Sequence, residues 1–426
     1  MNTLFKPRWG LLILCLALMV FNFNSASPVK AEGAQIFVSA SGTGTACTQA
    51  NPCEPSQGLT NAVAGDTIYF RYGPYTDVLH DPYMTITKAV SLVGGWDGAA
   101  TGDVVIDPEM YVTIIDGGSA RALLIINDTS GSGDLITIQG IRFQQASATT
   151  EGGAIFIQEG RVDIINCEFL NNYAGSYGGA ISIESGYDVR IIGNIFDNNV
   201  VDYGGGSIYA ASTDSDNTVA LIEDNIFYGG DADYGSAIHN WDCRIVVNRN
   251  KFYETAGVSA IRLTSLGPVS TISNNIFIRV AQNAVESSSM PDSPHQIWNN
   301  TFVGAGNGVV LYSGTAVEVI NNIFASCSYG IRYFGGTLTG SNNLFYNNTT
   351  NGGDALPNPV YEDPDFVSPA TDDYHISEES PAINAGAAIS LTEDYDGEFR
   401  PSGGGYDIGA DEIQSGTQVY IPILLN

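Results

Sequence analysis

The stretch TISNNIFIRVAQNAVESSSMPDSPHQIWNNTF, residues 271–302, contains one phrase twice, as NNIF at 274–277 and as NNTF at 299–302. The related phrases elsewhere are NCEF (166–169), GNIF (193–196), DNIF (224–227), RNKF (249–252), NNIF (321–324) and NNLF (342–345). Their phenylalanines, counted from Phe143, are 26, 27, 31, 25, 25, 25, 22 and 21 residues apart. A period of about 20–30 residues indicates one supersecondary unit that stacks on copies of itself.

Short segments rich in Ile and Val lie between these phrases, for example VDII (162–165), VALI (219–222) and VEVI (317–320). Gly, Asn, Asp and Ser bound them, which is typical of strands separated by turns. A leucine-rich repeat needs Leu at fixed spacing, and a propeller blade needs roughly 40–50 residues. A unit of about 25 residues instead allows three short strands. The repeat therefore predicts one rung of a parallel β-helix.

The Asn that precedes each Phe has a physical role in this coil. Asn tolerates the left-handed backbone conformation, so it suits a sharp corner. Stacked corners bring Asn side chains into register, where amide ladders can form along the axis. The Phe after each corner is expected to stack on its neighbours inside the coil.

A second column pairs a small residue with Ile or Val in each repeat. Its members are Ala154-Ile155, Ala180-Ile181, Ser207-Ile208, Ala237-Ile238, Ala260-Ile261, Ala284-Val285, Gly308-Val309 and Gly330-Ile331. The GGAI and NNxF phrases resemble the right-handed parallel β-helix of the pectin-lyase-like superfamily over roughly residues 34–366. This resemblance implies an all-β, right-handed parallel β-helix, and we expect roughly 11–13 rungs with capped ends.

The two ends of the chain differ from the repeats. Lys6 and Arg8 precede the apolar run 11–21, and small residues follow it, which predicts a secretory signal peptide over residues 1–31. The apolar run is too short for a transmembrane helix, so no membrane span is expected in the mature chain. We predict a β-helix with its N-terminal cap over 32–366, a C-terminal cap over 367–414 and a short tail over 415–426. The protein is therefore expected to be secreted or to lie at the cell surface.

The predicted C-terminal cap has motifs of its own, SPAINAG (380–386), DYDGEFRP (394–401) and YDIGADE (406–412). They resemble the bacterial choice-of-anchor Q domain, which occurs at the ends of secreted β-helix proteins. Arg400 lies among Asp394, Asp396, Glu398 and Asp407, and these charges are expected to form structural ion pairs.

Charge and cysteine content restrict the partners. The formal net charge is −30, from 46 acidic and 16 basic residues, and such an acidic chain is not suited to nucleic acid. Cys47 and Cys53 lie six residues apart in a polar loop of an exported chain, so we expect a disulfide between them. Cys167, Cys243 and Cys327 are expected to be buried thiols.

The repeat register predicts which side chains share an outer face. Because side chains alternate along a strand, the residue after each column Ile or Val should point outward. That column is Phe156, Ser182, Tyr209, His239, Arg262, Glu286, Val310 and Arg332, and the residues two positions further on are Gln158, Glu184, Ala211, Trp241, Thr264, Ser288, Tyr312 and Phe334. His239, Arg262 and Glu286 are thus candidate catalytic residues on three successive rungs.

The same face offers candidate ligand-binding residues, Tyr209, Trp241, Glu184 and Arg332. Aromatic faces can cover a pyranose ring, and Arg can fork onto a carboxylate. A polysaccharide lyase would need a base and a cation that stabilises an enolate, roles open to His239 and Arg262.

Asp202, Asp231 and Asp233, which lie near rung corners, are candidate ligands of Ca²⁺. No cofactor is otherwise indicated.

Three functions remain open from the sequence. The first is an adhesion-type protein that binds extracellular polysaccharide or cell-surface glycan without a catalytic set. The second is a polysaccharide lyase or glycoside hydrolase that uses the face of His239, Arg262 and Glu286. The third is a structural stalk. Fold alone does not choose among them, because one fold supports many functions.

Overall fold

The computed structural model describes residues 33–76, 81–120, 122–130, 133–184, 186–211, 219–264, 269–288, 293–353 and 355–414. Its described elements are one α-helix, α1 (Pro55–Asn61), one 3-10 helix, η1 (Pro369–Thr371), and β-strands. The predicted signal peptide and the predicted tail lie outside the described residues. Of the helices that are described, none has the length and apolar character needed to cross a membrane.

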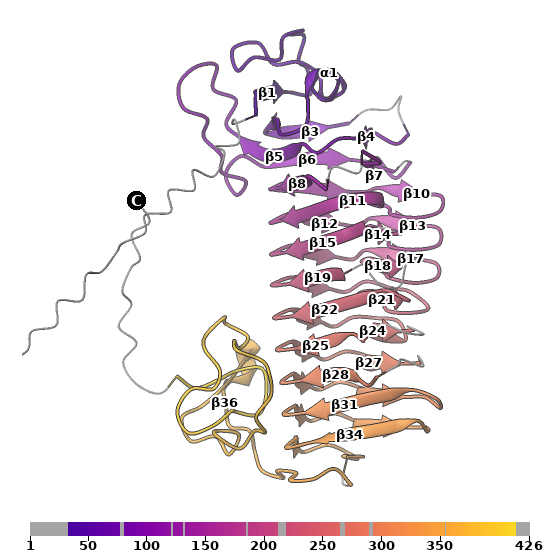
Figure 1. The fold of residues 1–426 in the computed structure, drawn as a ribbon, viewed down its shortest axis with the longest axis vertical. Coiled ribbons are helices and arrows are strands. Elements are labelled where there is room, and N and C mark those ends of the chain that lie inside the picture. Colours follow the sequence, from indigo (N-terminus) through magenta and orange to yellow (C-terminus); the bar gives the residue numbers. More distant parts are fainter. Residues whose placement is uncertain are drawn as a thin grey trace, which may run out of the picture. The chain divides into compact units, whose positions relative to one another are not determined.

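Parallel strands form a coil in which each turn between the first and the last adds one strand to each of three faces (Figure 1). The strands of the first face, here called sheet 1, are β1 (Gln35–Val38), β2 (Thr67–Arg71), β5 (Ser91–Trp96), β8 (Leu135–Gln139), β11 (Ile155–Ile165), β15 (Gly186–Ile192), β19 (Val219–Glu223), β22 (Arg244–Asn248), β25 (Thr271–Ser273), β28 (His295–Trp298), β31 (Ala316–Ile320) and β34 (Thr337–Ser341). The strands of sheet 2 are β4 (Met84–Ile86), β7 (Leu124–Asn127), the first part of β11, β14 (Ile181–Ile183), β18 (Ile208–Ala211), β21 (Ile238–Trp241), β24 (Ser259–Leu263), β27 (Asn283–Ser287), β30 (Asn307–Leu311) and β33 (Tyr329–Tyr333). Sheets 1 and 2 are continuous through β11, which pairs with strands of both.

Sheet 3 is the third face and has 11 strands. They are β3 (Gly73–Tyr75), β6 (Thr113–Asp116), β9 (Ile141–Gln144), β12 (Glu168–Leu170), β16 (Ile195–Asp197), β20 (Ile226–Tyr228), β23 (Lys251–Tyr253), β26 (Ile276–Ile278), β29 (Thr301–Val303), β32 (Ile323–Ala325) and β35 (Leu344–Tyr346). A small side sheet comprises β10 (Ser147–Ala148), β13 (Tyr173–Ala174) and β17 (Val200–Val201). The predicted parallel β-solenoid is confirmed.

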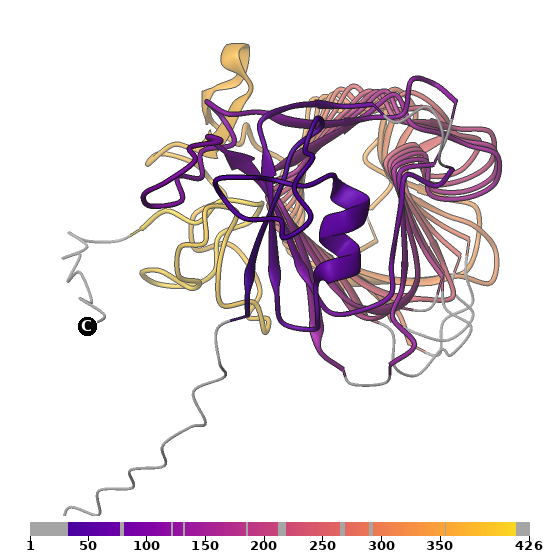
Figure 2. The ribbon, with the colours of Figure 1, turned by 90° about the horizontal axis from the view of Figure 1, so that it is seen from above.

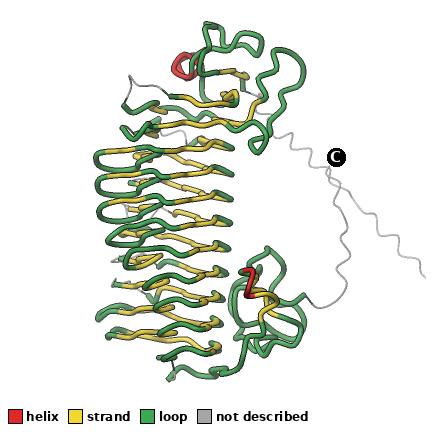
Figure 3. Tube along the Cα trace, turned by 180° about the vertical axis from the view of Figure 1, so that it is seen from behind, coloured by secondary structure: helices red, strands yellow, loops and turns green. Residues whose placement is uncertain are grey.

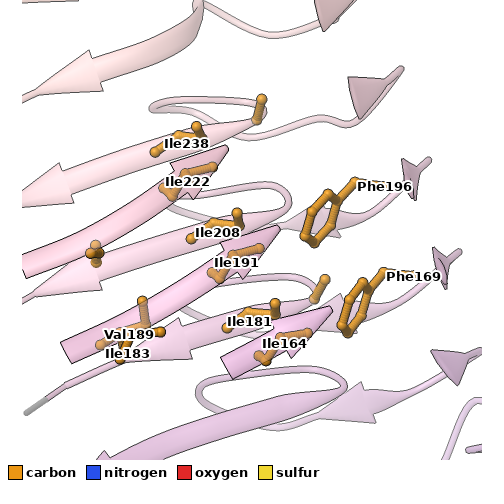
Figure 4. Close-up of a cluster of buried hydrophobic side chains, with 14 of the residues drawn as sticks. Ile164, Phe169, Ile181, Ile183, Val189, Ile191, Phe196, Ile208, Ile222 and Ile238 are labelled. Atoms are coloured by element: carbon orange, nitrogen blue, oxygen red, sulfur yellow. The ribbon is translucent and has the colours of Figure 1, made fainter. Parts of the chain in front are cut away.

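The interior is built from aligned columns of apolar side chains. Phe143, Phe169, Phe196, Phe227, Phe252, Phe277, Phe302, Phe324 and Phe345 are buried, as predicted. Successive rings in this stack are 4.6–5.3 Å apart and lie within 4–13° of parallel. Columns of Ile from sheets 1 and 2 face this stack across the core (Figure 4). Burial of these columns supplies the main driving force for the fold.

At each corner, two residues fill the two roles that the sequence analysis assigned to a single Asn. The first residue of each phrase takes the left-handed conformation, as Asn274 does at φ 53° and Arg249 at φ 55°. Except in NCEF, where Cys167 takes this place, the second residue is a buried Asn, and each of these Asn residues but the last donates its amide to the Asn of the next rung. This ladder is Asn194, Asn225, Asn250, Asn275, Asn300, Asn322 and Asn343, with Nδ2···Oδ1 distances of 2.9–3.1 Å. Because the side chain of a ladder Asn must point into the coil, the residue before it adopts the left-handed backbone conformation.

The N-terminal end of the coil is covered by a cap. The short helix α1 packs on β1, and Gly58 lies so close that an added Cβ would be 2.5 Å from Cγ1 of Val38. Figure 2 shows α1 across this end of the coil. The predicted disulfide between Cys47 and Cys53 is present. Cys167, Cys243 and Cys327 are buried and outside disulfides, as expected.

After β35 the chain closes the last turn and leaves the coil. Val360 pairs with Leu344, and residues 366–414, including the antiparallel strands β36 (Phe366–Ser368) and β37 (Asp373–Ile376), then contact the side of the coil (Figure 3). Asn299 Nδ2 donates to the carbonyls of Asp407 and Gly409, both at 2.9 Å. The region predicted as a C-terminal cap thus lies against sheet 3, where corner Asn side chains and apolar residues offer it partners.

Arg400 anchors this C-terminal region. Its side chain is fully buried and pairs with the buried Glu412 at 2.8 Å. It also donates to the carbonyls of Gly409 and Ala410. The sequence correctly indicated a structural role for Arg400, but its ion-pair partner is Glu412 and not the acidic residues nearer in sequence.

Candidate functional site on sheet 2

The strand pairing of sheet 2 confirms the predicted register. His239 of β21 lies beside Arg262 of β24, and Arg262 lies beside Glu286 of β27. The same pairing runs through the rest of the column, Phe156, Ser182, Tyr209, Val310 and Arg332. The sequence spacing of the repeats therefore predicted correctly which of these side chains lie side by side.

His239 is almost fully buried, at 1% exposure, although the sequence predicted an accessible residue. The rings of Tyr209, Tyr234 and Trp241 surround its imidazole at centroid distances of 5.4, 6.0 and 6.2 Å. The corner at Gly204 closes over it, because a Cβ there would lie 2.2 Å from Nδ1. Rungs only about 4.8 Å apart let large neighbouring side chains cover a smaller one between them.

The surroundings of His239 determine its charge and tautomer. Burial, together with the positive charge of Arg262, lowers its pKa to about 3, so the imidazole is neutral at physiological pH. Thr264 Oγ1 donates to the carbonyl of Asn240, so this oxygen accepts the proton of His239 Nε2 at 3.0 Å. Nδ1 then carries a lone pair and has no hydrogen-bond partner among the described residues. The neutral ring could accept a proton at Nδ1, but its lowered pKa makes it a weak base and it is buried away from solvent.

Arg262 and Glu286 form an ion pair. Their Nη1 and Oε1 atoms are 2.5 Å apart, and Glu286 is 1% exposed. Asn283 Nδ2 donates to the second oxygen of Glu286 at 2.8 Å, while the guanidinium of Arg262 lies 4.2 Å from the ring centre of Tyr234. Both charges are therefore occupied by partners within the chain. Glu286 was also expected to be accessible, and the structure buries it beneath Arg262.

A strip of aromatic side chains follows the outer face of sheet 2 and its adjoining corner. Its exposed members, with exposed fractions, are Tyr203 (40%), Trp241 (48%), Tyr312 (38%) and Phe334 (52%). Tyr177, Tyr203 and Tyr234 are in ring contact in sequence order at 5.3 and 5.0 Å. Tyr312 and Phe334 stack at 5.4 Å further along the coil. Tyr209, predicted as a ligand contact, is 7% exposed and stacks beneath Tyr177.

The corner tyrosines were not chosen as site residues from the sequence. A signal for them exists, because Tyr177, Tyr203 and Tyr234 each precede a glycine of the recurring turn. The glycines allow the turns to approach each other closely, and the tyrosines are thereby placed at the edge of sheet 2.

The charges differ between the two ends of the strip. Glu184 is exposed at the N-terminal end, and the pKa of neighbouring Glu151 is raised by burial and by the charge of Glu184. Arg332 is exposed at the C-terminal end, where its guanidinium lies 5.1 and 4.8 Å from the rings of Tyr329 and Phe334. No described carboxylate pairs with Arg332.

The three predicted calcium ligands do not form a cluster. Asp202 accepts a hydrogen bond from Tyr173, and Asp231 and Asp233 lie one rung further on.

Among the described residues, the group with metal-binding spacing is His375, Asp396 and Asp411. The imidazole of His375 contacts Asp373 at 2.5 Å and Asp396 at 2.8 Å. These carboxylates raise its pKa to about 9. Protonated His375 itself therefore supplies a positive charge to this group.

Comparison with solved structures finds one protein of similar fold and two weaker matches. A crystal structure of pectate lyase Pel9A matches with a TM-score of 0.55 and 14% identity, over 89% of this chain and 96% of that one. The PL6 family alginate lyase AlyGC matches at 16% identity and TM-score 0.36, over 82% and 57% of the two chains. The PL6 family polysaccharide lyase Pedsa3628 from Pseudopedobacter saltans matches at 13% identity and TM-score 0.42, over 81% and 97%. At 14% identity, the likeness to Pel9A speaks for the fold alone, and the other two matches, whose TM-scores are below 0.5, are too weak to support a conclusion.

A search of the curated proteins found no match. The family described as "Right handed beta helix region" matches residues 112–324, half of the chain. This segment contains the phenylalanine stack up to Phe324 and most of the aromatic strip. From its repeats, its strand order and this match, the chain belongs to the right-handed β-helix family.

Proposed function

We propose that this protein is exported and binds an extracellular polysaccharide along the aromatic strip of sheet 2. The observation that carries the proposal is a set of exposed rings along sheet 2, Tyr203 and Trp241 and, three rungs beyond Trp241, Tyr312 followed by Phe334. Exposed aromatic faces pack against the apolar faces of sugar rings. Parallel strands stacked along the coil axis place these two groups of rings on one line, which suits an extended polymer.

Binding without catalysis fits the site better than an enzyme does. A general base must reach the proton that it removes, and His239 is covered by three aromatic rings. Arg262 is held by Glu286 at 2.5 Å. A lyase or hydrolase at this place would require the covering corner to move. Secretion or surface display remains part of the proposal and rests on the N-terminal sequence.

The test incubates the purified chain, with and without Ca²⁺, with a panel of polyuronates and neutral glycans. Bound glycan and new unsaturated or reducing ends are both measured. We expect binding without new ends. Replacement Trp241→Ala should weaken binding about fivefold, since losing one stacked ring costs on the order of 1 kcal/mol.

Phe399→Ala is the matched control, because Phe399 is 70% exposed but lies in the C-terminal region. It should bind like the wild type. New ends that disappear in Arg262→Met would instead support the lyase or hydrolase. Absence of binding across the panel would contradict the proposal and favour a structural stalk for the glycans tested.

A further inference from the structure

A cleft of about 780 Å³ lies on sheet 3, away from the aromatic strip of sheet 2. The coil contributes residues of β16, β20 and β23 with their corners and Arg279 after β26, and the C-terminal region contributes Thr371 and Asp372. Its polar, charged and aromatic lining includes Asp197, Tyr228, Asp231, Glu254, Arg279 and Asp372. A volume of this size holds a small organic ligand.

Tyr228 presents one open aromatic face to this cleft. Its other face stacks on Tyr253, with ring centres 4.9 Å apart and planes 17° from parallel. On the preceding rung its strand partner is Asp197, which is smaller and leaves room above the ring. Tyr228 is 41% exposed, and no described ring or cation covers its open face. Tyr253 packs against a cluster that contains Ile278 and Tyr374, so the stacked pair of Tyr228 and Tyr253 is held in place.

The cleft has an excess of negative charge. Arg279 is the cation that lines it, and Glu254 and Asp372 both bind this guanidinium, with closest distances of 2.9 and 2.6 Å. Arg279 lowers the pKa of Asp372, which keeps that carboxylate charged. Asp197 and Asp231 have no cationic partner among the described residues. Two carboxylates thus remain uncompensated beside an open aromatic ring.

We propose that this cleft is a second binding site, for a saccharide that carries a protonated amino group. A sugar ring placed on the open face of Tyr228 would bury the apolar side of that ring. An ammonium group on the same sugar would interact with Asp197 or Asp231, and the ring quadrupole of Tyr228 would add to the attraction. Polyuronates are excluded from this site, because like charges repel. The flat exposed ring favours a sugar over a basic peptide, whose long side chains need no such platform.

This inference does not depend on the function proposed for sheet 2. It can be tested with four labelled probes, a glucosamine tetramer, its fully N-acetylated counterpart, a galacturonate tetramer and tetralysine. Binding is measured at about pH 5.5, where an amine is protonated. The glucosamine tetramer should bind at least tenfold more tightly than the other three, and added salt should weaken it, because exposed charges are screened.

Variants locate the site. Tyr228→Ala and the double replacement Asp197→Asn/Asp231→Asn should each weaken binding of the glucosamine tetramer about tenfold or more, while Tyr228→Phe should retain it. Tyr346→Ala is the matched control, since Tyr346 is an exposed tyrosine of the same sheet outside this cleft. Trp241→Ala removes a ring on sheet 2 and should leave binding of the glucosamine tetramer unchanged, which distinguishes the two sites.

Four outcomes would overturn the proposal. They are no binding of the glucosamine tetramer, equal binding of its N-acetylated form, equal binding of tetralysine, and loss of binding in Trp241→Ala. Thermal unfolding of each variant identifies misfolding, and Asp197→Asn/Asp231→Asn, which should also weaken binding, keeps the test valid if Tyr228→Ala is unstable. If the cleft on sheet 3 does not bind the glucosamine tetramer, the results of the glycan panel and of Trp241→Ala for sheet 2 still stand.

Discussion

At the scale of single residues, the buried asparagines show how one side chain can satisfy several backbone groups. Asn275 Nδ2 donates to the carbonyls of Val247 and Ser273 at 2.9 and 2.8 Å, and also to Asn300 Oδ1 at 3.0 Å. Its own Oδ1 accepts from the backbone and the side chain of Asn250. The amide therefore pairs polar groups at a corner where the sheet ladder is interrupted, and buried groups without such partners are costly.

Replacing Asn275 with Ala should lower the free energy of unfolding by roughly 2–4 kcal/mol. The physical reason is that several buried donors and acceptors lose their partners, each at about 1–3 kcal/mol before relaxation or water entry. Denaturant unfolding followed by circular dichroism measures the effect. The control is Asn347→Gly, at an exposed corner Asn with φ 52° whose left-handed backbone Gly also adopts. Equal loss in the two variants would contradict a special role for the ladder.

At the scale of elements, strands of sheet 2 are joined by more than their backbone hydrogen bonds. Arg262 on β24 and Glu286 on β27 form a pair across adjacent rungs at 2.5 Å. Burial of Glu286 makes the pair costly to break, because the remaining charge stays away from water. The pair therefore holds the strands in register at the centre of the candidate site, and this structural role competes with a catalytic one.

The double replacement Arg262→Met/Glu286→Met should destabilise the protein less than the sum of the two single replacements. Removing Glu286 alone should cost about 3 kcal/mol, since it leaves a guanidinium without its carboxylate, and removing both charges avoids that penalty. The coupling is read from a double-mutant cycle in denaturant unfolding. Strict additivity would show that the pair contributes nothing beyond its separate side chains.

At the scale of the whole molecule, the C-terminal region is attached to the coil by polar and charged contacts. Arg249 on the coil binds Glu393 at 2.9 Å, and Arg279 binds Asp372 at 2.6 Å. Within the C-terminal region, His375 lies between Asp373 and Asp396. The stability of this region should therefore depend on pH through His375, whose folded-state pKa of about 9 exceeds its ordinary value of 6.5.

The sign of this dependence follows from linkage. A raised His pKa means that the folded state binds the proton more tightly, so the stabilisation is complete below about pH 6.5 and is lost as the pH rises through 9. We expect the wild type to lose stability between these values, and His375→Gln to remove most of that slope. Thermal unfolding and limited proteolysis across the pH range measure it. The control is Glu378→Gln, an exposed neighbour that should keep the slope; an unchanged slope in His375→Gln would contradict the assignment.

The sequence alone determined the repeat, the three-sided coil, the stacked phenylalanines and the register of sheet 2. These features depend on contacts between one rung and the next, and side chains recurring every 21–31 residues encode such contacts directly. The alignment of His239, Arg262 and Glu286 was predictable for this reason. The Cys47–Cys53 disulfide was predictable because its partners are close in sequence.

Only the tertiary structure decided which of these aligned groups solvent can reach. The corner at Gly204 and the surrounding rings bury His239, and the pairing of Arg400 with Glu412 depends on how residues 400–412 turn back. The cleft beside Tyr228 forms where Asp372 approaches Arg279, 93 residues away in the chain. A periodic pattern specifies neighbours along the coil axis. It does not specify how non-repeating corners and the C-terminal region fold over the side of the coil, because those contacts depend on loop geometry and packing.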